Sequence, residues 1–354
     1  MPSTREVHVG MLGSGFIGDF HALGLRYVAG ARVVANYGAG PERRAAFARR
    51  FGSHPFDSIE GVCADRDVDL VVVSLPNHLH LEAVRIAAEH GKAVACTKPL
   101  GRNAIEAGEM LRLVEGAGVF NAYLENVVFT SETVRMREMI EAGAIGRLTT
   151  FRAREGHSGP HASHFWDAEL AGGGALLDMA SHGAEAARYL FGKDVAVRDV
   201  FAWGATLVHG DRTTGEDNAV MLVRFADDRV ATMDVSWSSK GGLENRFEAY
   251  GDAGRIVEDI SSTMLRAFIE RPAGYIGEKV DADTGWVFPV PDEPYAHGHD
   301  AMMRHVVESF RDGATPRETF RDGFVVNAII DAAYRSMRSG TWESVVQAAP
   351  VRVA

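Results

Sequence analysis

The chain has 354 residues, long enough for two domains that each bury a substantial core. Its formal net charge of -11, with no long Lys or Arg run, argues against binding to the phosphate backbone of nucleic acid. Cys63 and Cys96 show neither a disulfide framework nor a metal-type spacing, and we see no secretory segment or membrane-spanning run. We therefore expect a cytoplasmic protein.

The first expected element is a short apolar strand, Val7 to Leu12, followed by a glycine turn and a helix from Asp19 to Val28. The turn reads Gly13-Ser14-Gly15-Phe16-Ile17-Gly18. Glycines at this spacing allow a tight turn, approach of the backbone to a pyrophosphate, and close helix packing. This order of elements favours dinucleotide binding over the alternative, a glycine-rich turn without a ligand.

A second strand, Ala31 to Tyr37, ends at Gly38, where a Rossmann domain usually carries the acidic residue that holds the adenosine ribose. A loop containing Arg43 and Arg44 is expected next. Because the carboxylate that would repel a 2'-phosphate is missing, the cofactor is left as NAD or NADP. Whether Arg43 or Arg44 points at the ribose or into solvent also stays open.

Asp69 to Leu75 reads as a buried strand, and the strand Ala93 to Cys96 runs into Thr97-Lys98-Pro99. Lys98 then lies at the carboxyl end of a parallel strand, the edge where open α/β sheets bind ligands. An ammonium there can bind a substrate oxygen and favour its deprotonation. A helix from Ala104 to Gly116 and a strand from Val119 to Leu124 complete this alternation.

The second part of the chain favours consecutive strands, which indicates an antiparallel sheet. The expected strands span 147–155, 194–207, 218–225, 229–236, 246–250 and Met264 to Glu270, with helices over 132–141, 300–311 and 323–337. The predicted fold class is α/β: an N-terminal Rossmann domain with a parallel sheet, then an α+β domain with a large, mainly antiparallel open sheet. We expect the dinucleotide-binding domain over residues 1–126 and a substrate-binding and oligomerisation domain over 127–354, whose last helices can pack back on the first domain.

A triple glycine, Gly172 to Gly174, precedes a run of helix formers that extends through Phe191. Asp178 and His182, four residues apart, share one face of the expected helix. The carboxylate can fix the ring tautomer and stabilise the imidazolium, which favours an acid/base pair. An ordinary polar helix face is the alternative.

The loop before the triple glycine contains His157, His161, His164 and Trp166. Histidine and carboxylate together permit a metal site, but no HExxH-type helix or cysteine pair accompanies them. We therefore expect no metal and instead contact between substrate and at least one of these histidines. Trp166 is expected to anchor the loop or to stack on a sugar.

The glycine turn, the strand-end Lys98-Pro99 and the segment Gly172 to Gly183 together resemble the Gfo/Idh/MocA family of oxidoreductases, over nearly the whole chain. In that family a glutamate usually precedes Lys-Pro, where this chain has Thr97. Lys98, Asp178 and His182 match the family pattern, so the resemblance implies catalytic roles for these three. It also implies that places matching Pro76, Asn77, His80 and Asn126 line the cofactor cleft.

The resemblance implies hydride transfer between a nicotinamide cofactor and a secondary hydroxyl or ketone of a sugar, cyclitol or glycoside. Glycoside cleavage by transient oxidation and elimination, and non-catalytic nucleotide or sugar sensing, are the alternatives. Because strands such as 219–223 are apolar on both faces, we expect a homodimer or homotetramer packed sheet to sheet. The expected cofactor-binding residues are Gly13, Gly15, Phe16, Ile17, Gly18, Gly38, Arg43, Ser74, Pro76, Asn77, His80, Lys98 and Asn126. The expected substrate-binding residues are Lys98, His157, His161, His164, Trp166, Asp178 and His182.

Overall fold

A computed structural model describes residues 5–259, 267–271, 284–287, 289 and 292–347. Within these ranges the chain forms two compact units. The first unit contains residues 5–130 and 297–325, and the second contains 131–296 and 326–347. The domain boundary predicted between residues 126 and 127 stays a prediction.

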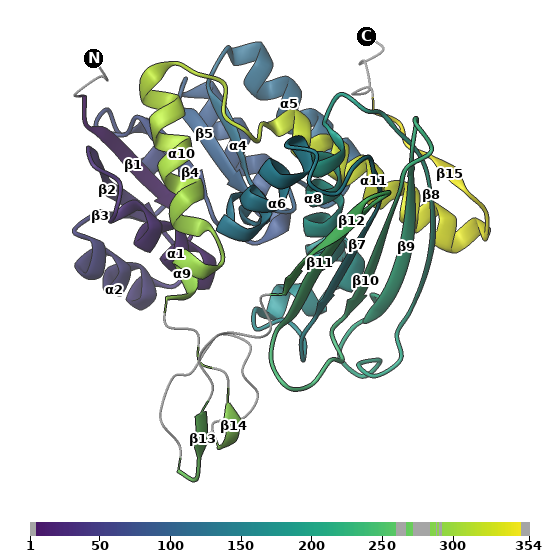
Figure 1. Ribbon diagram of the computed structural model, residues 1–354. Helices are drawn as coiled ribbons and strands as arrows, with labels where there is room; N and C mark the ends of the chain where they lie inside the picture. The colour runs from purple at the N-terminus through teal and green to yellow at the C-terminus, as the bar shows by residue number, and fades with distance from the viewer. Residues whose placement is uncertain (1–4, 260–266, 272–283, 288, 290–291, 348–354) are drawn as a thin grey trace. The chain divides into compact units, whose positions relative to one another are not determined.

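The first unit is built on a six-stranded parallel sheet with strand order β3-β2-β1-β4-β5-β6 (Figure 1). Its strands are β1 (Val7–Leu12), β2 (Ala31–Tyr37), β3 (His54–Phe56), β4 (Leu70–Val73), β5 (Ala93–Thr97) and β6 (Asn121–Leu124). This is the strand order of a Rossmann fold, in which the order reverses between β1 and β4. All four residues of β4 are buried, as a parallel strand covered on both faces requires.

Helices of the first unit follow the first five strands of this sheet: α1 (Phe16–Leu25), α2 (Pro41–Phe51), α3 (Ile59–Ala64), α4 (His80–Glu89) and α5 (Ala104–Ala117). A later helix, α10 (His299–Asp312), packs along α1. The approach is close, because a Cβ at Gly24 of α1 would lie 3.0 Å from the carbonyl oxygen of His299. The chain thus returns to this unit after building most of the second one.

The expectation of a loop around Arg43 and Arg44 is wrong. These residues form the first turns of α2, which begins at Pro41. Proline suits the first helical position because its fixed φ matches a helix and its missing N–H is not needed there.

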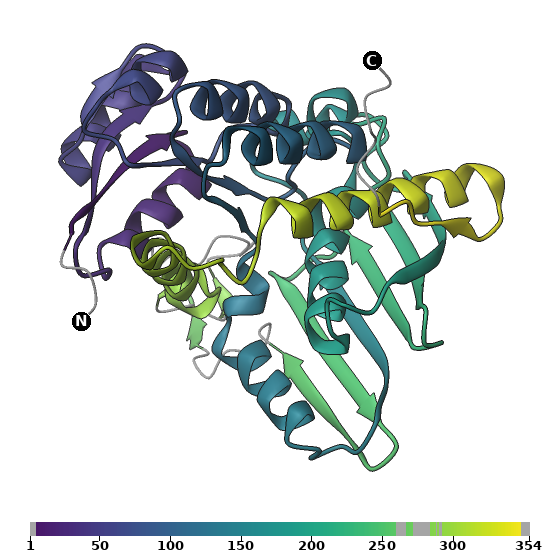
Figure 2. The same ribbon diagram turned by 90° about the horizontal axis from the view of Figure 1, so that it is seen from above.

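The second unit is built on a seven-stranded sheet with order β12-β11-β7-β10-β9-β8-β15 (Figure 1). Figure 2 shows the teal and green strands of this sheet from above. Its strands are β7 (Leu148–Gly156), β8 (Val197–Ala205), β9 (Asn218–Phe225), β10 (Val230–Ser236), β11 (Glu244–Gly251), β12 (Gly254–Asp259) and β15 (Glu343–Ser344). Neighbouring strands are antiparallel except β7 and β10, which pair in parallel. The predicted α/β fold class, with a mainly antiparallel second sheet, is confirmed.

The strand expected over Met264 to Glu270 does not join this large sheet. Residues 264–266 lie outside the described residues, and β13 (Ala267–Ile269) pairs with β14 (Gly285–Val287) in a separate two-stranded sheet. Phe268 and Trp286 face each other across this pair, with ring centroids 5.6 Å apart. A strand pattern alone does not say which strand will be its neighbour.

The two faces of the seven-stranded sheet differ in what covers them. Helix α8 (Ser181–Phe191) and the π-helical turn η4 (Leu176–Ala180) pack on one face, where a Cβ at Gly183 would lie 2.8 Å from Met233 of β10. On the opposite face, Trp203 and Val220 lie across from each other on neighbouring strands and are 52% and 41% exposed. The helices α6 (Ser131–Glu141), α7 (Ala168–Ala171) and α9 (Glu293–Ala296) complete this unit.

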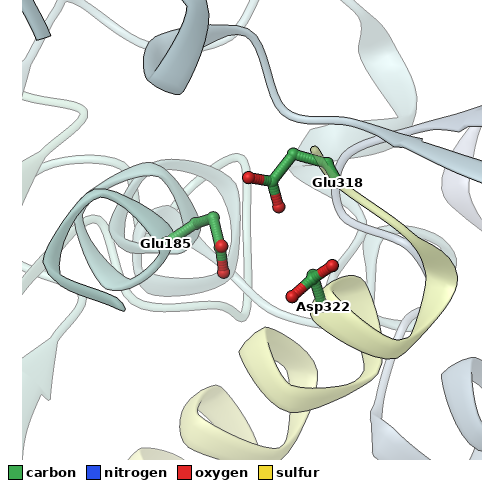
Figure 3. A group of neighbouring side chains, drawn as sticks. All are labelled: Glu185, Glu318 and Asp322. Atoms are coloured by element: carbon green, nitrogen blue, oxygen red, sulfur yellow. The ribbon is translucent and has the colours of Figure 1, made fainter. Parts of the chain in front are cut away.

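Helix α11 (Phe320–Ser339) begins in the first unit and continues into the second. The Asp322 carboxylate near its start accepts hydrogen bonds of 2.8 Å from the backbone N–H and the hydroxyl of Thr319. Figure 3 draws Asp322 and Glu318 at this end of α11, and Glu185 on α8. Glu185 forms ion pairs with Arg188 and Lys193 of its own unit. None of the helices in the described ranges carries an apolar stretch able to cross a membrane.

Candidate active site

The glycine turn after β1 has the shape that close approach of a dinucleotide requires. Gly13 has φ +118°, and a Cβ there would lie 2.2 Å from the carbonyl oxygen of Ser74. A Cβ at Gly18 would lie 2.2 Å from the carbonyl oxygen of Gly13, whereas one at Gly15 would meet nothing within 4 Å. Gly13 and Gly18 therefore permit the tight turn, and Gly15 leaves open space over the start of α1. The turn fits a pyrophosphate at a helix N-terminus.

Two other residues of this turn flank the open space. Phe16 is 44% exposed and packs against Phe20 with ring centroids 4.3 Å apart, and Ile17 is half-buried. Their backbone N–H groups begin α1, where no side chain caps the helix. Such N–H groups are available to an anion.

The end of β4 meets the same turn. The backbone N–H of Ser74 donates 2.7 Å to the Leu12 carbonyl, and its hydroxyl lies 2.8 Å from Nδ1 of His21. His21 lies in α1 and is fully buried, and burial lowers its pKa to about 3. The ring is therefore neutral and ties α1 to the end of β4. Sequence reasoning missed His21, although it lies three residues after Gly18.

Pro76, Asn77 and His80 follow Ser74 in a short turn that leads into α4. His80 is fully buried, with Nε2 2.8 Å from the Leu75 carbonyl and Nδ1 3.1 Å from the carbonyls of Pro99 and Leu100. Burial lowers its pKa, against the opposing effect of these carbonyls. The ring thus links the backbone just after β4, at Leu75, to the backbone just after β5, at Pro99 and Leu100.

Lys98 directly follows β5, at the carboxyl end of a parallel strand as the sequence predicts. Its side chain is half-buried. The His80 ring contacts the carbonyls of Pro99 and Leu100, the two residues that follow Lys98. Asn126 follows β6, and its Nδ2 donates 2.8 Å to the carbonyl of His297, just before α10. In the first unit, the structure therefore places predicted residues at the ends of β1, β4, β5 and β6.

The end of β2 has no carboxylate, as predicted. Gly38 is buried, and a Cβ there would lie 1.9 Å from Oγ of Ser14. Arg44 donates 3.2 Å to the Gly38 carbonyl and pairs with Asp57, whereas Arg43 is exposed. The guanidinium of Arg44 is thus occupied by the Gly38 carbonyl and Asp57. Arg43 is the better placed of the two to meet a ligand from solvent.

In the second unit, the predicted pair lies at the start of the long helical segment. Asp178 belongs to the π-helical turn η4 and His182 to the first turn of α8. Each is only 7% exposed, so the pair does not form an ordinary solvated helix face. A Cβ at Gly173 would lie 2.0 Å from Oη of Tyr334, which explains one of the three glycines.

A tryptophan that directly follows β10 contacts Asp178. The indole Nε1 of Trp237 donates a 3.0 Å hydrogen bond to Oδ2 of Asp178, and both residues are buried. The ring centroids of Trp237 and Trp166 are 5.5 Å apart. The guanidinium carbon of Arg212 lies 3.7 Å from the centroid of the Trp166 ring. The structure therefore brings Trp166 into one cluster with Asp178.

The loop histidines have different surroundings. His157 is buried and its Nδ1 accepts a 3.0 Å bond from the Gly159 N–H, so it shapes the loop. His161 is exposed, and His164 is half-buried with its ring 4.4 Å from that of Phe165. Trp166 donates 3.1 Å to the Pro160 carbonyl, which supports the predicted role as a loop anchor.

Comparison with known proteins now adds to this geometry. Residues 7–123 match the oxidoreductase family with an NAD-binding Rossmann fold, and residues 133–257 match the GFO/IDH/MocA C-terminal domain. Myo-inositol 2-dehydrogenase of Thermotoga maritima is 30% identical over 72% of this chain and 75% of its own. The chain belongs to the GFO/IDH/MocA oxidoreductase family. The predicted family, enzyme class and nicotinamide cofactor are thereby confirmed.

Full-length relatives give the same result. Levoglucosan dehydrogenase of Pseudarthrobacter phenanthrenivorans is 28% identical over 97% of this chain and 99% of its own. A solved structure of GenD2 from gentamicin A biosynthesis in complex with NAD has a TM-score of 0.90 and 28% identity, covering 97% of each chain. A levoglucosan dehydrogenase complex with NADH and levoglucosan has a TM-score of 0.81 and 27% identity, covering 96% of this chain and all of the other. This GFO/IDH/MocA member is an oxidoreductase with a nicotinamide dinucleotide cofactor.

Proposed function

We propose that this enzyme oxidises a secondary hydroxyl of a sugar, cyclitol or glycoside, or reduces the corresponding ketone. The observation that carries the proposal is the buried Asp178 and Trp237 pair beside His182, in a chain that belongs to a family of nucleotide-dependent oxidoreductases. The names of its relatives, which include levoglucosan and inositol dehydrogenases, support a polyhydroxylated substrate.

We assign the chemistry to three side chains of this chain. His182 accepts the hydroxyl proton, Lys98 polarises the same oxygen with its ammonium, and Asp178 orients the imidazole or binds a neighbouring hydroxyl. A bound nicotinamide ring supplies the acceptor for the hydride. In the reducing direction, His182 returns the proton.

The dinucleotide has its own proposed residues in the first unit. The open space over Gly15 and the start of α1, which no side chain caps, suit the pyrophosphate, with Gly13 and Gly18 keeping the turn tight. Ser74, Pro76, Asn77 and Asn126 offer polar or backbone groups at neighbouring strand ends, and His80 acts by fixing the backbone around Lys98.

The test is an assay of nicotinamide absorbance against a panel of inositols, aldoses, anhydrosugars and glycosides. With the best substrate, we expect Lys98→Ala and His182→Ala to lower kcat by about a hundredfold or more. Lys240→Ala and His54→Ala change exposed residues of the same types and serve as matched controls. Unchanged turnover in both site variants would contradict the assignment.

We also propose that the protein is a homodimer or homotetramer that buries the outer face of the seven-stranded sheet. Support comes from Trp203 and Val220, large apolar residues that lie opposite each other on that face and are 52% and 41% exposed. Adjacent exposed apolar side chains of this size commonly mark an interface. A cytoplasmic location stays a prediction.

A further inference from the structure

The helical segment that carries Asp178 and His182 begins without a capping side chain of its own. An α-helix or π turn leaves its first backbone N–H groups without partners inside the helix. Here the residue at the N-cap position is Ala175, and no side chain bonds back at that point. The preceding glycines have no side chain that could do so. The missing acceptors must therefore come from elsewhere in the chain.

Glu216, 40 residues further along the chain, supplies them. Its carboxylate Oε1 accepts a 2.9 Å hydrogen bond from the N–H of Leu176, and its backbone carbonyl accepts a 2.8 Å bond from the N–H of Ala175. Glu216 is 7% exposed and lies just before β9. One residue thus satisfies two consecutive N–H groups at the start of the turn that carries Asp178.

Tyr334 of α11 completes this arrangement within the same unit. Its hydroxyl donates 2.9 Å to Oε1 of Glu216 and accepts 3.1 Å from the N–H of Gly174. Three consecutive backbone N–H groups, from Gly174 to Leu176, are therefore held by two side chains and one carbonyl. We call Glu216 and Tyr334 the helix brace.

The glycines before the turn are explained by the helix brace. A Cβ at Gly174 would lie 2.1 Å from the Glu216 carbonyl oxygen, and one at Gly173 would lie 2.0 Å from the Tyr334 hydroxyl. No other residue type could fit without moving one of these partners. The glycine run is thus shaped to admit Glu216 and Tyr334, and not only to make a turn.

A carboxylate in this place also matches the charge of a helix start. Burial raises the pKa of Glu216, while the bonds from the Leu176 N–H and the Tyr334 hydroxyl act in the opposite direction. The partial positive charge at a helix N-terminus favours an acceptor of negative charge. Both bonds end on Oε1, which accepts them through its lone pairs.

We propose that Glu216, held by Tyr334, is a positioning residue. It fixes the turn that carries Asp178, whose carboxylate meets the Trp237 indole, and that leads into the helix carrying His182. The inference rests on the proposed roles of Asp178 and His182. Its prediction is specific: loss of the brace displaces Asp178 and lowers turnover without weakening dinucleotide binding, because the brace lies wholly in the second unit.

The experiment compares Glu216→Ala, Glu216→Gln and Tyr334→Phe with a control, Ser336→Ala. Ser336 is also fully buried on α11, where its hydroxyl accepts 3.0 Å from the Ala202 N–H and donates 2.6 Å to the Thr341 carbonyl. Each variant is measured for kcat and substrate KM, for NADH affinity by fluorescence, and for the Trp237 indole N–H signal by NMR. The signal is assigned with Trp237→Phe.

We expect Glu216→Ala to lower kcat by about tenfold or more, to leave NADH affinity within about twofold, and to shift or broaden the Trp237 signal. Glu216→Gln keeps a side-chain oxygen for the Leu176 N–H and the backbone carbonyl for the Ala175 N–H. We therefore expect its kcat to stay within about threefold of the parent. Tyr334→Phe should fall between them. Ser336→Ala should lose stability but keep kcat and the Trp237 signal.

Other outcomes separate the inference from the function on which it rests. If Glu216→Ala and Tyr334→Phe leave both kcat and the Trp237 signal unchanged, or if Ser336→Ala changes them equally, the positioning role is overturned. If the parent enzyme oxidises no sugar but the Trp237 signal still moves in Glu216→Ala, the brace is supported and the proposed function fails. Should Glu216→Ala not fold, Glu216→Gln and Tyr334→Phe carry the same comparison.

Discussion

The indole Nε1 of Trp237 donates a 3.0 Å hydrogen bond to Oδ2 of Asp178, from a position 59 residues further along the chain. The indole is fully buried, and Trp166 packs 5.5 Å away from it. A buried carboxylate that loses such a donor is left with an uncompensated desolvation cost. The bond therefore fixes where the Asp178 carboxylate lies.

Replacement of Trp237 tests this relationship. Trp237→Phe keeps an aromatic ring but removes the N–H, so we expect a loss of about 1–3 kcal/mol in the free energy of unfolding. We also expect kcat to fall by about tenfold, because Asp178 is no longer held in place. Urea unfolding and steady-state kinetics measure the two effects. Trp203→Phe, on the exposed face of the sheet, is the matched control, and equal losses in both variants would count against the idea.

His21 makes the first unit sensitive to acid. In the unfolded chain a histidine has a pKa near 6.5, whereas burial lowers the pKa of His21 to about 3. Between these values the unfolded state binds more protons, so stability is present above about pH 6.5 and is lost as the pH falls. At pH 5 the loss from this group is roughly 2 kcal/mol.

Denaturant unfolding at several pH values checks this prediction. His21→Gln should be less stable near neutral pH, because it changes the hydrogen bond to Ser74, but it should lose less stability on acidification than the parent. His54→Gln, which alters an exposed histidine, should follow the parent curve. Parallel curves for the parent and His21→Gln would show that His21 is not the group responsible.

The two arginines after Gly38 should differ in their effect on cofactor choice. Arg44 holds the Gly38 carbonyl and pairs with Asp57, whereas Arg43 is exposed at the start of α2. If a 2'-phosphate is bound, a guanidinium is the group suited to bind it. Arg43→Ala should then raise KM for NADP by about tenfold and leave KM for NAD within about twofold.

Arg44→Ala provides the comparison for this prediction. It should weaken both dinucleotides alike and lower stability, because it removes a brace of the loop. The measurement is KM for each cofactor at saturating substrate. A parent enzyme without detectable activity with NADP, together with no effect of Arg43→Ala, would show that Arg43 faces only solvent.

The outer face of the seven-stranded sheet should control assembly. Trp203 and Val220 lie opposite each other in the register of β8 and β9, and both are exposed. Val220→Glu should place a charge in the proposed interface and reduce the mass measured by light scattering toward that of one chain. Tyr27→Glu, which changes a residue of the first unit that is 66% exposed, should have no such effect. A parent protein with the mass of a monomer would refute the proposed assembly.

Local pattern was sufficient for most of the first unit. Periodicity and glycine spacing placed β1 and β2 at their observed bounds, and Lys98 at the end of a parallel strand. Short elements were different: β3 and α3 have only 3 and 6 residues, too few to show a period. The first turn of α2 is expected as a loop because Gly40-Pro41 is equally typical of a turn and of a helix start.

Partners that are distant in sequence could not be predicted. The sequence placed Asp178 and His182 on one helical segment, but nothing near them indicates Trp237 or Glu216. A single sequence shows which residues can form a hydrogen bond, not which ones the sheet brings together. The parallel pairing of β7 with β10 could not be predicted for the same reason, because strand patterns do not encode which strands become neighbours.

The contact between Gly38 and Ser14 couples two positions in the evolution of cofactor preference. A Cβ at position 38 would lie 1.9 Å from Oγ and 3.1 Å from Cβ of Ser14, so an acidic residue there requires the Ser14 hydroxyl to turn away. The side chain at position 14 therefore influences which residues position 38 accepts. A library that varies positions 14 and 38 together would sample cofactor preference more fully than one that varies position 38 alone.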